Sequence, residues 1–170
     1  VLLLDEDGKH VRHGAAPGLP PAFVQAIDGA AIGPNAGSCG TAAWRGKAVI
    51  VENIATDPLW DGYRQLAAPY GLRACWSTPI FDPARRVLGT FAIYYREPRG
   101  LAPEHAALIE MATQTAAIAI EHCRTSEKLR ISNERFLLAS RATNDVVWDW
   151  DFARNTLWWS ENVTAVFGYS

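Results

Sequence analysis

The chain has 170 residues, a net charge of −2 at neutral pH and a hydrophobic fraction of 49%. This size and composition are typical of one globular domain with part of a second. The near-balanced charge provides no basic surface for nucleic acid or for an acidic membrane. No run of about 18 apolar residues occurs that could span a bilayer.

The sequence of the first 71 residues predicts a hairpin followed by short helices and a strand. The hairpin turns at Asp7-Gly8. After it we expect a helix over residues 20–29, a second short helix through Trp44, a buried strand over residues 48–54 and a helix over residues 57–71. Ser38 is expected to cap the second helix. Asp57 is expected to cap the last one, with Pro58 in its first turn.

Two longer strands follow, over residues 74–81 and 86–97, and both are rich in β-branched and aromatic residues. From Pro103 the chain runs for about forty residues without Gly or Pro. Its first half is apolar and its second half is charged, which predicts a long helix that packs on the sheet and then projects from it. A broken heptad leaves a coiled coil open. The alternating "DVVWDWDF" and the later "TLWWS" predict two more strands, followed by a short helix.

Three cysteines, Cys39, Cys75 and Cys123, are spread over the chain. Their small number and wide spacing argue against a disulfide framework and favour a reducing compartment, so we expect a cytoplasmic protein. No CxxC or HxxxH spacing occurs, so the sequence indicates no metal site. The chain begins with Val1 inside an apolar run, and we expect it to be a piece of a longer protein.

Three long stretches together resemble the GAF domain, a small-molecule sensor fold. They are "GSCGTAAWRGKAVIVENIATDPLW", "GLRACWSTPIFDPARRVLGTFAIYYREPRGL" and "AALIEMATQTAAIAIEH". The segment "ERFLLASRATNDVVWDWDFARNTLWWSENVTAVFGYS" resembles the opening of a PAS domain. The resemblance implies an α+β fold with a central antiparallel sheet flanked by helices, a long C-terminal signalling helix and an incomplete PAS start.

The resemblance also implies the domain organisation and the kind of protein. Residues 1–122 would form a GAF sensor domain without the family's N-terminal helix, residues 123–141 a linking signalling helix, and residues 142–170 the start of a PAS domain. This arrangement occurs in bacterial sensory histidine kinases and in some cyclic-dinucleotide enzymes. We therefore expect a regulatory module that binds an unidentified small molecule and forms a homodimer through its C-terminal helix. His105 and His122 lack the following acidic residue that marks a phosphoacceptor, so the fragment itself is not expected to be catalytic.

Cys39, in "GSCGTA", permits two interpretations. A cysteine at a helix start can be a reactive thiol, and the stretch resembles free methionine sulfoxide reductases of the GAF type. Those enzymes need further cysteines in the segment that follows, and "ENIATDPLWDGYRQL" has none. We therefore favour a packing role for Cys39, with a thiol-based enzyme as the alternative.

Candidate ligand-binding residues come from both sides of the pocket that GAF domains have. An aromatic-lined cavity with a few polar groups is typical of small-molecule sites, but the sequence identifies no cofactor. The candidates lie at the glycine-rich helix start, on the following helix and on the opposing strand: Ser38, Cys39, Asp57, Trp60, Tyr63, Cys75, Trp76 and Ser77.

Overall fold

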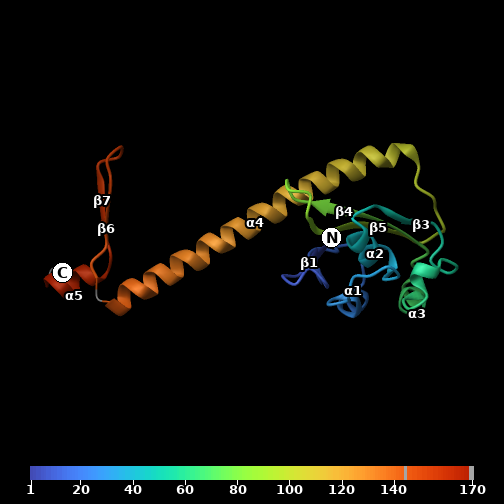
Figure 1. Ribbon diagram of the computed structural model, residues 1–170, viewed down its shortest axis with the longest axis horizontal. Helices are drawn as coiled ribbons and strands as arrows, with labels where there is room; N and C mark the ends of the chain where they lie inside the picture. Colours follow the sequence, from blue (N-terminus) through green and yellow to red (C-terminus); the bar gives the residue numbers. More distant parts are fainter. Residues whose placement is uncertain (144, 169–170) are drawn as a thin grey trace. The chain divides into compact units, whose positions relative to one another are not determined.

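The computed structural model describes residues 1–143 and 145–168 and divides the chain into two compact units, one ending at Glu121 and the other beginning at His122. Each unit is described by itself. The first unit contains a five-stranded sheet and helices on both of its faces (Figure 1), which confirms the α+β fold predicted from the sequence. Within the described residues, no helix has the length and apolar character that crossing a membrane requires.

The sheet of the first unit is antiparallel throughout, with strand order β2-β1-β5-β4-β3. Its strands are β1 (Leu2–Leu4), β2 (Val11–His13), β3 (Val49–Val51), β4 (Ala74–Phe81) and β5 (Val87–Tyr95). The hairpin predicted at Asp7-Gly8 joins β1 to β2, and Gly8 has the positive φ of 67° that its turn requires. The two longest strands, β4 and β5, form the centre of the sheet and pair along almost their whole length.

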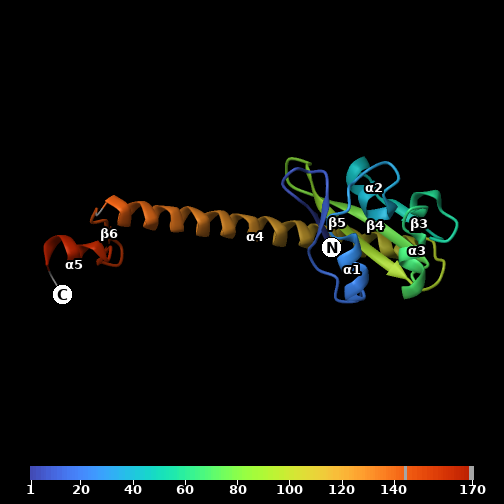
Figure 2. The same cartoon turned by 90° about the horizontal axis from the view of Figure 1, so that it is seen from below.

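Helices cover the two faces of this sheet (Figures 1 and 2). The helices on the first face are α1 (Pro21–Ile27), α2 (Gly37–Arg45), the 3-10 helix η1 (Pro58–Trp60), α3 (Arg64–Ala67) and the 3-10 helix η2 (Ala68–Tyr70). The beginning of α4 (Pro103–Thr143) covers the other face, where His105 contacts Trp76. Because side chains alternate along a strand, Cys75 and Ser77 face α2 while Trp76 faces α4.

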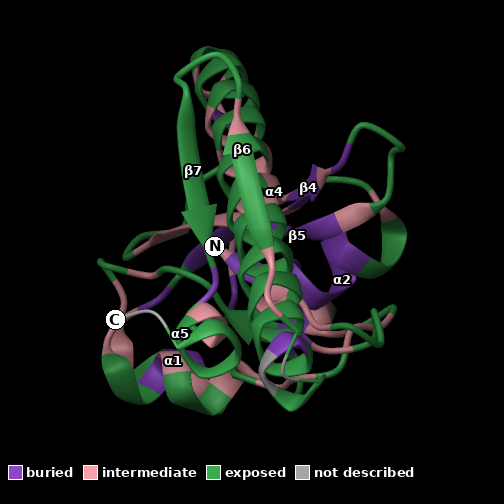
Figure 3. Cartoon of the chain, turned by 90° about the vertical axis from the view of Figure 1, so that its left-hand side faces the viewer, coloured by how far each residue is buried: buried purple, intermediate pink, exposed green. Residues whose placement is uncertain are grey.

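The main core lies between the sheet and the helices of the first face, where α2 and β4 are largely buried (Figure 3). Phe23 of α1 is fully buried and meets Tyr70 and Tyr94 edge to face, with ring centroids 5.8 and 5.7 Å apart. Small residues let α2 approach the strands closely. A Cβ on Gly40 would lie 2.7 Å from the Cβ of Ala36, so a larger residue would force the start of the helix to shift.

Two local predictions were wrong. Ser38 does not cap α2, because the helix begins earlier, at Gly37, and the Ser38 hydroxyl is bonded to other elements. The continuous helix expected over residues 57–71 is instead divided into η1, α3 and η2. Gly62 and Pro69 explain the divisions, since glycine weakens a helix and proline lacks the N–H that continues it. The Asp57 cap is confirmed, because its carboxylate accepts from the N–H of Leu59 at 2.9 Å.

The second unit contains the end of α4, the hairpin β6 (Trp148–Asp151) and β7 (Thr156–Trp159), and α5 (Asn162–Phe167). The two strands occur where the alternating sequence predicts them, and Asn155 adopts a positive φ of 50° in the turn. The large side chains of this hairpin are exposed: Trp148, Trp150, Phe152, Leu157, Trp158 and Trp159. The assignment of residues 142–170 to a PAS domain stays a prediction.

Candidate functional site

Ser38 connects three elements beneath the first turn of α2. Its hydroxyl accepts from the indole N–H of Trp60 at 3.0 Å and donates to the carbonyl of Cys75 at 3.2 Å. All three residues are buried. Ser38 therefore holds η1 and β4 against α2, and its hydroxyl is occupied on both its donor and its acceptor side.

Cys39 and Cys75 belong to one buried cluster, to which two contacts assign them. Ser38, the neighbour of Cys39 in the chain, touches the Cys75 carbonyl, and the Cys39 sulfur lies 3.6 Å from the hydroxyl of Tyr94. Tyr94 is in turn the direct partner of Cys75 across β4 and β5. The structure thus brings together two thiols that are 36 positions apart in the chain.

The buried hydroxyls of Ser77 and Thr90 lie on the same face of the sheet as Cys75 and Tyr94. Ser77 follows Cys75 by two positions on β4, and Thr90 precedes Tyr94 by four on β5, so all four share the α2 face of the sheet. Ser77 and Thr90 are both fully buried, and among the described residues neither hydroxyl has a hydrogen-bond partner. Unpartnered buried hydroxyls cost free energy, and these two lie close enough to Cys39 to act on its thiol.

The surroundings act differently on the two thiols. The pKa of Cys39 is lowered to about 6, chiefly by the neighbouring Cys75 thiol and also by the hydroxyls of Ser77, Tyr94 and Thr90, although burial opposes this. Burial raises the pKa of Cys75 well above its usual value, and the neighbouring Cys39 raises it further. Cys39 is therefore the thiol of the pair that ionises first.

A cavity of about 320 Å³ opens beside β5. Its volume is within the range of small-molecule sites, and its lining is mostly apolar. Cys39 and Tyr94 contribute its thiol and hydroxyl groups. The other lining residues come from β1, β2, β5, α1 and the segment between β2 and α1, and they include Leu2, His13, Ala15, Pro17, Leu19, Val24, Ile27, Phe91 and Ala92.

The space expected beside the helix of residues 57–71 is largely filled. The gap there, lined by Trp60 and Tyr63, has a volume of about 30 Å³, roughly that of one water molecule. The buried indole of Trp60 occupies this region and meets Tyr63 and Tyr94 edge to face at 6.3 Å. Cys39 borders both this gap and the larger cavity.

The structure places two of the predicted site residues elsewhere. Trp76 lies on the opposite face of the sheet, where its indole N–H donates to the Arg99 carbonyl at 3.0 Å, so we remove it from the candidate site. Asp57 caps the start of η1 and is absent from the described linings of the cavity and of the smaller gap. The structure brings together Ser38, Cys39, Trp60, Tyr63, Cys75 and Ser77.

The sequence analysis did not identify Tyr94, Thr90 and Ala92 as site residues, although they surround Cys39 or line the cavity. The alternation within "GTFAIYY" places all three on one face of a strand, but it cannot say which face meets α2. That choice follows from the register of β5 against β4, which pairs Tyr94 with Cys75.

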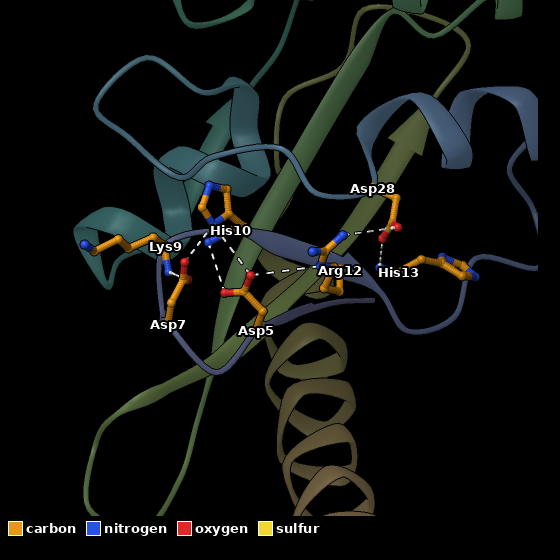
Figure 4. A network of polar contacts seen from close by, with 7 residues as sticks. All are labelled: Asp5, Asp7, Lys9, His10, Arg12, His13 and Asp28. Carbon is orange, nitrogen blue, oxygen red and sulfur yellow. Dashed lines mark hydrogen bonds and ion pairs between the residues drawn. The ribbon is translucent and has the colours of Figure 1, made fainter.

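A separate cluster of charged residues surrounds the β1–β2 turn (Figure 4). The imidazole Nδ1 of His10 lies 3.0 Å from a carboxylate oxygen of Asp7 and 3.5 Å from one of Asp5. These residue types can bind a divalent cation. The guanidinium of Arg12 lies 3.9 Å from Asp5, however, and a cation would have to compete with it. We assign no metal to this cluster.

Comparisons with known proteins are consistent with this geometry. The sequence profile of the GAF domain matches residues 1–121. The "Methyl sulfide methyltransferase-associated sensor" of Methanosarcina acetivorans is 41% identical over 145 residues, which are 85% of this chain and 14% of that protein. The chain thus spans a small part of this relative's length.

Solved structures share the fold at low identity. A domain assigned to a two-component sensor histidine kinase protein of Sinorhizobium meliloti has a TM-score of 0.61 at 22% identity, covering 76% of this chain and 81% of that one. The GAF domain of an Acinetobacter phosphoenolpyruvate-protein phosphotransferase has a TM-score of 0.58 at 16% identity, with coverages of 75% and 72%. The free methionine-R-sulfoxide reductase of Neisseria meningitidis has a TM-score of 0.52 at 16% identity, with coverages of 74% and 67%.

Proposed function

This chain belongs to the GAF domain family, and we propose that it is the sensory module of a larger cytoplasmic signal-transduction protein, a sensor histidine kinase, that binds a small molecule. The observation that carries the proposal is the cavity of about 320 Å³ beside β5. Support also comes from the relative named as a sensor. The small number and wide spacing of the cysteines favour a reducing compartment.

The ligand expected from the cavity is small and mostly apolar. The walls contributed by α1 and β5 are aliphatic and aromatic, and Tyr94 supplies a hydroxyl that can donate to one polar group of the ligand. We therefore extend the ligand site from the predicted group around Trp60 to the cavity beside it. Cys39, which borders both, remains in the site.

We propose that the signal leaves through α4. Tyr95, next to Tyr94, faces the opposite side of the sheet, where its ring lies 4.5 Å from that of Trp76. Trp76 then contacts His105 in the first turn of α4, with ring centroids 5.5 Å apart. A ligand would bias α4 through these contacts only as far as its affinity differs between two packings of the sheet.

Exposed apolar residues of α4 support a homodimer. Leu108, Met111, Ile118, Leu129 and Phe136 are all exposed and occupy a and d positions of one heptad frame, whose other a and d positions hold Thr115, His122, Thr125 and Ser132. The ion pairs that Arg130 makes with Glu127 and Glu134 fall at b and f positions, on the opposite side of the helix. A second copy of the chain would bury the apolar row and leave these charges in water.

Native mass spectrometry of the protein purified from its own host tests the ligand proposal. We expect a co-purified small molecule with the unaltered chain. Ala92→Trp, which fills the cavity from β5, should abolish it. The matched control is Ala84→Trp, since Ala84 is exposed in the turn between β4 and β5. Loss of the ligand from both variants, or from neither, would contradict the assignment of the site.

A thiol-based enzyme is the second candidate, and the observation that favours it is that Tyr94 contacts the Cys39 sulfur and pairs with Cys75 across the sheet. Such an enzyme would turn over free methionine sulfoxide in the presence of a dithiol reductant. The sensory proposal predicts no turnover above the rate of Cys39→Ser. Multiple turnovers that depend on Cys39 would establish the enzyme instead.

A further inference from the structure

The side chain of Cys39 reaches the cavity, whereas that of Cys75 does not. Cys39 lines the space of about 320 Å³ beside β5. Cys75 is fully buried beneath it and is absent from the described lining of that cavity. A small reagent that enters the cavity therefore meets the Cys39 sulfur first.

The groups around the Cys39 sulfur are suited to stabilising negative charge and a newly formed S–O bond. Tyr94 Oη lies 3.6 Å away, and the hydroxyls of Ser77 and Thr90 face it without partners of their own among the described residues. Both hydroxyls come from fully buried residues, so water cannot satisfy them from the surface. Hydroxyl donors that become bonded when sulfur ionises or gains oxygen lower the free energy of those states.

We propose that Cys39 and Cys75 form a redox-active dithiol, which a hydroperoxide converts to an internal disulfide between α2 and β4. This goes beyond the binding of a small molecule and does not depend on it. The proximity of the pair follows from Ser38, which bonds to the Cys75 carbonyl, and from Tyr94, which contacts Cys39 and pairs with Cys75.

The reaction has two steps. The Cys39 thiolate attacks one oxygen of hydrogen peroxide and the O–O bond breaks. Cys39 becomes a sulfenic acid, and the second oxygen leaves as water after taking up the proton that the thiol released. The sulfur of Cys75 then attacks the sulfur of Cys39 and the S–O bond breaks. The departing hydroxide takes the Cys75 proton, so two thiols and one hydrogen peroxide give one disulfide and two waters.

The disulfide would change the candidate ligand site. Joining Cys39 to Cys75 would move the Cys39 sulfur, which now lines the cavity and contacts Tyr94 Oη. The oxidised and reduced forms would therefore present different cavity linings. This links the oxidation state of the pair to the affinity of whatever the cavity binds.

The experiment uses the full chain with Cys123→Ser, because Cys123 is exposed on α4 and could form disulfides between chains. The protein is treated with hydrogen peroxide, and the remaining thiols are alkylated before intact-mass and peptide analysis. We expect a product lighter by two hydrogens, with no alkylation and with the peptides of Cys39 and Cys75 linked. The rate should approach its plateau at a pH below the usual pKa of a thiol, because the groups around Cys39 lower its pKa. Intact, fully alkylated thiols after this treatment would overturn the proposal.

A second variant shows the order of the two steps. With Cys75→Ala in the same background, Cys39 should stop at the sulfenic acid, which dimedone traps as a stoichiometric adduct. With Cys39→Ala, Cys75 should remain a free thiol. If Cys75 is oxidised equally well without Cys39, Cys39 is not the residue that meets the peroxide and the proposal fails. Circular dichroism of each variant shows that the fold is intact.

Discussion

Ser38→Ala is expected to destabilise the first unit by about 2–4 kcal/mol. The substitution removes the hydrogen bond to the Cys75 carbonyl, worth about 1 kcal/mol. It also leaves the indole N–H of Trp60 without its acceptor in a buried position, which costs about 1–3 kcal/mol more. Urea unfolding followed by far-UV circular dichroism measures the change in the free energy of unfolding.

A double-mutant cycle separates the orphaned indole from the lost serine. Trp60→Phe removes the N–H and about 50 Å² of apolar surface, for a cost of about 1–2 kcal/mol. In the combined variant no buried donor lacks an acceptor, so its cost should be at least about 1 kcal/mol below the sum of the single costs. Ser126→Ala, on the exposed side of α4, is the matched control and should change the free energy by less than about 0.5 kcal/mol. Costs that simply add would refute the assigned role of Ser38.

Three further predictions concern the sheet, the charged turn and α4. Gly89→Ala should destabilise the chain by at least about 2 kcal/mol and release the amides of β1 to hydrogen exchange, because the new Cβ would meet the carbonyl oxygen of Leu2; protected β1 amides would contradict this. The Asp7 carboxyl should titrate by NMR with a pKa of about 2, lowered first by the side chain of Asp5 and also by the N–H of Lys9 and the imidazole of His10, so that His10→Ala raises it. The contribution of Asp7 to stability is then fully present above pH 3.8 and is lost as the pH falls toward 2. Leu129→Asp should convert a dimer to a monomer in sedimentation experiments, because it places a charge at an a position; a chain that is already monomeric would exclude the proposed dimer.

Elements with a strong local pattern could be predicted from the sequence. The apolar and aromatic runs of β4 and β5 and the uninterrupted composition of α4 each satisfy one period throughout, and the structure has these elements where the sequence predicts them. The turn at Asp7-Gly8 was equally clear, because few residue pairs fit a tight hairpin. The prediction of one helix over residues 57–71 was wrong, because it gave more weight to the apolar spacing than to the helix-breaking residues Gly62 and Pro69.

The candidate site could be predicted only in part, for a different physical reason. The sequence indicated Ser38, Cys39 and Cys75, but no local pattern shows that two thiols 36 positions apart are brought together. That contact depends on the register of β4 against β5 and on the position of α2 above them. Trp60 shows the same limit, since an aromatic residue that could line a pocket instead fills it.

Neighbouring residues of β4 and of β5 face opposite sides of the sheet. In each strand, a residue of the candidate site is therefore followed directly by a residue on the face toward α4. Cys75 and Tyr94 are paired on the face toward α2, and the next residues, Trp76 and Tyr95, contact each other on the face toward α4. A displacement of one strand relative to the other at the thiols must therefore also move the two aromatic rings. His105 rests on Trp76 and carries a buried Nδ1 for which no hydrogen-bond partner is found in the described part of the chain, so few polar contacts would resist a shift. Ligand binding in the cavity and disulfide formation beneath it would thus reach α4 through the same pair of strands.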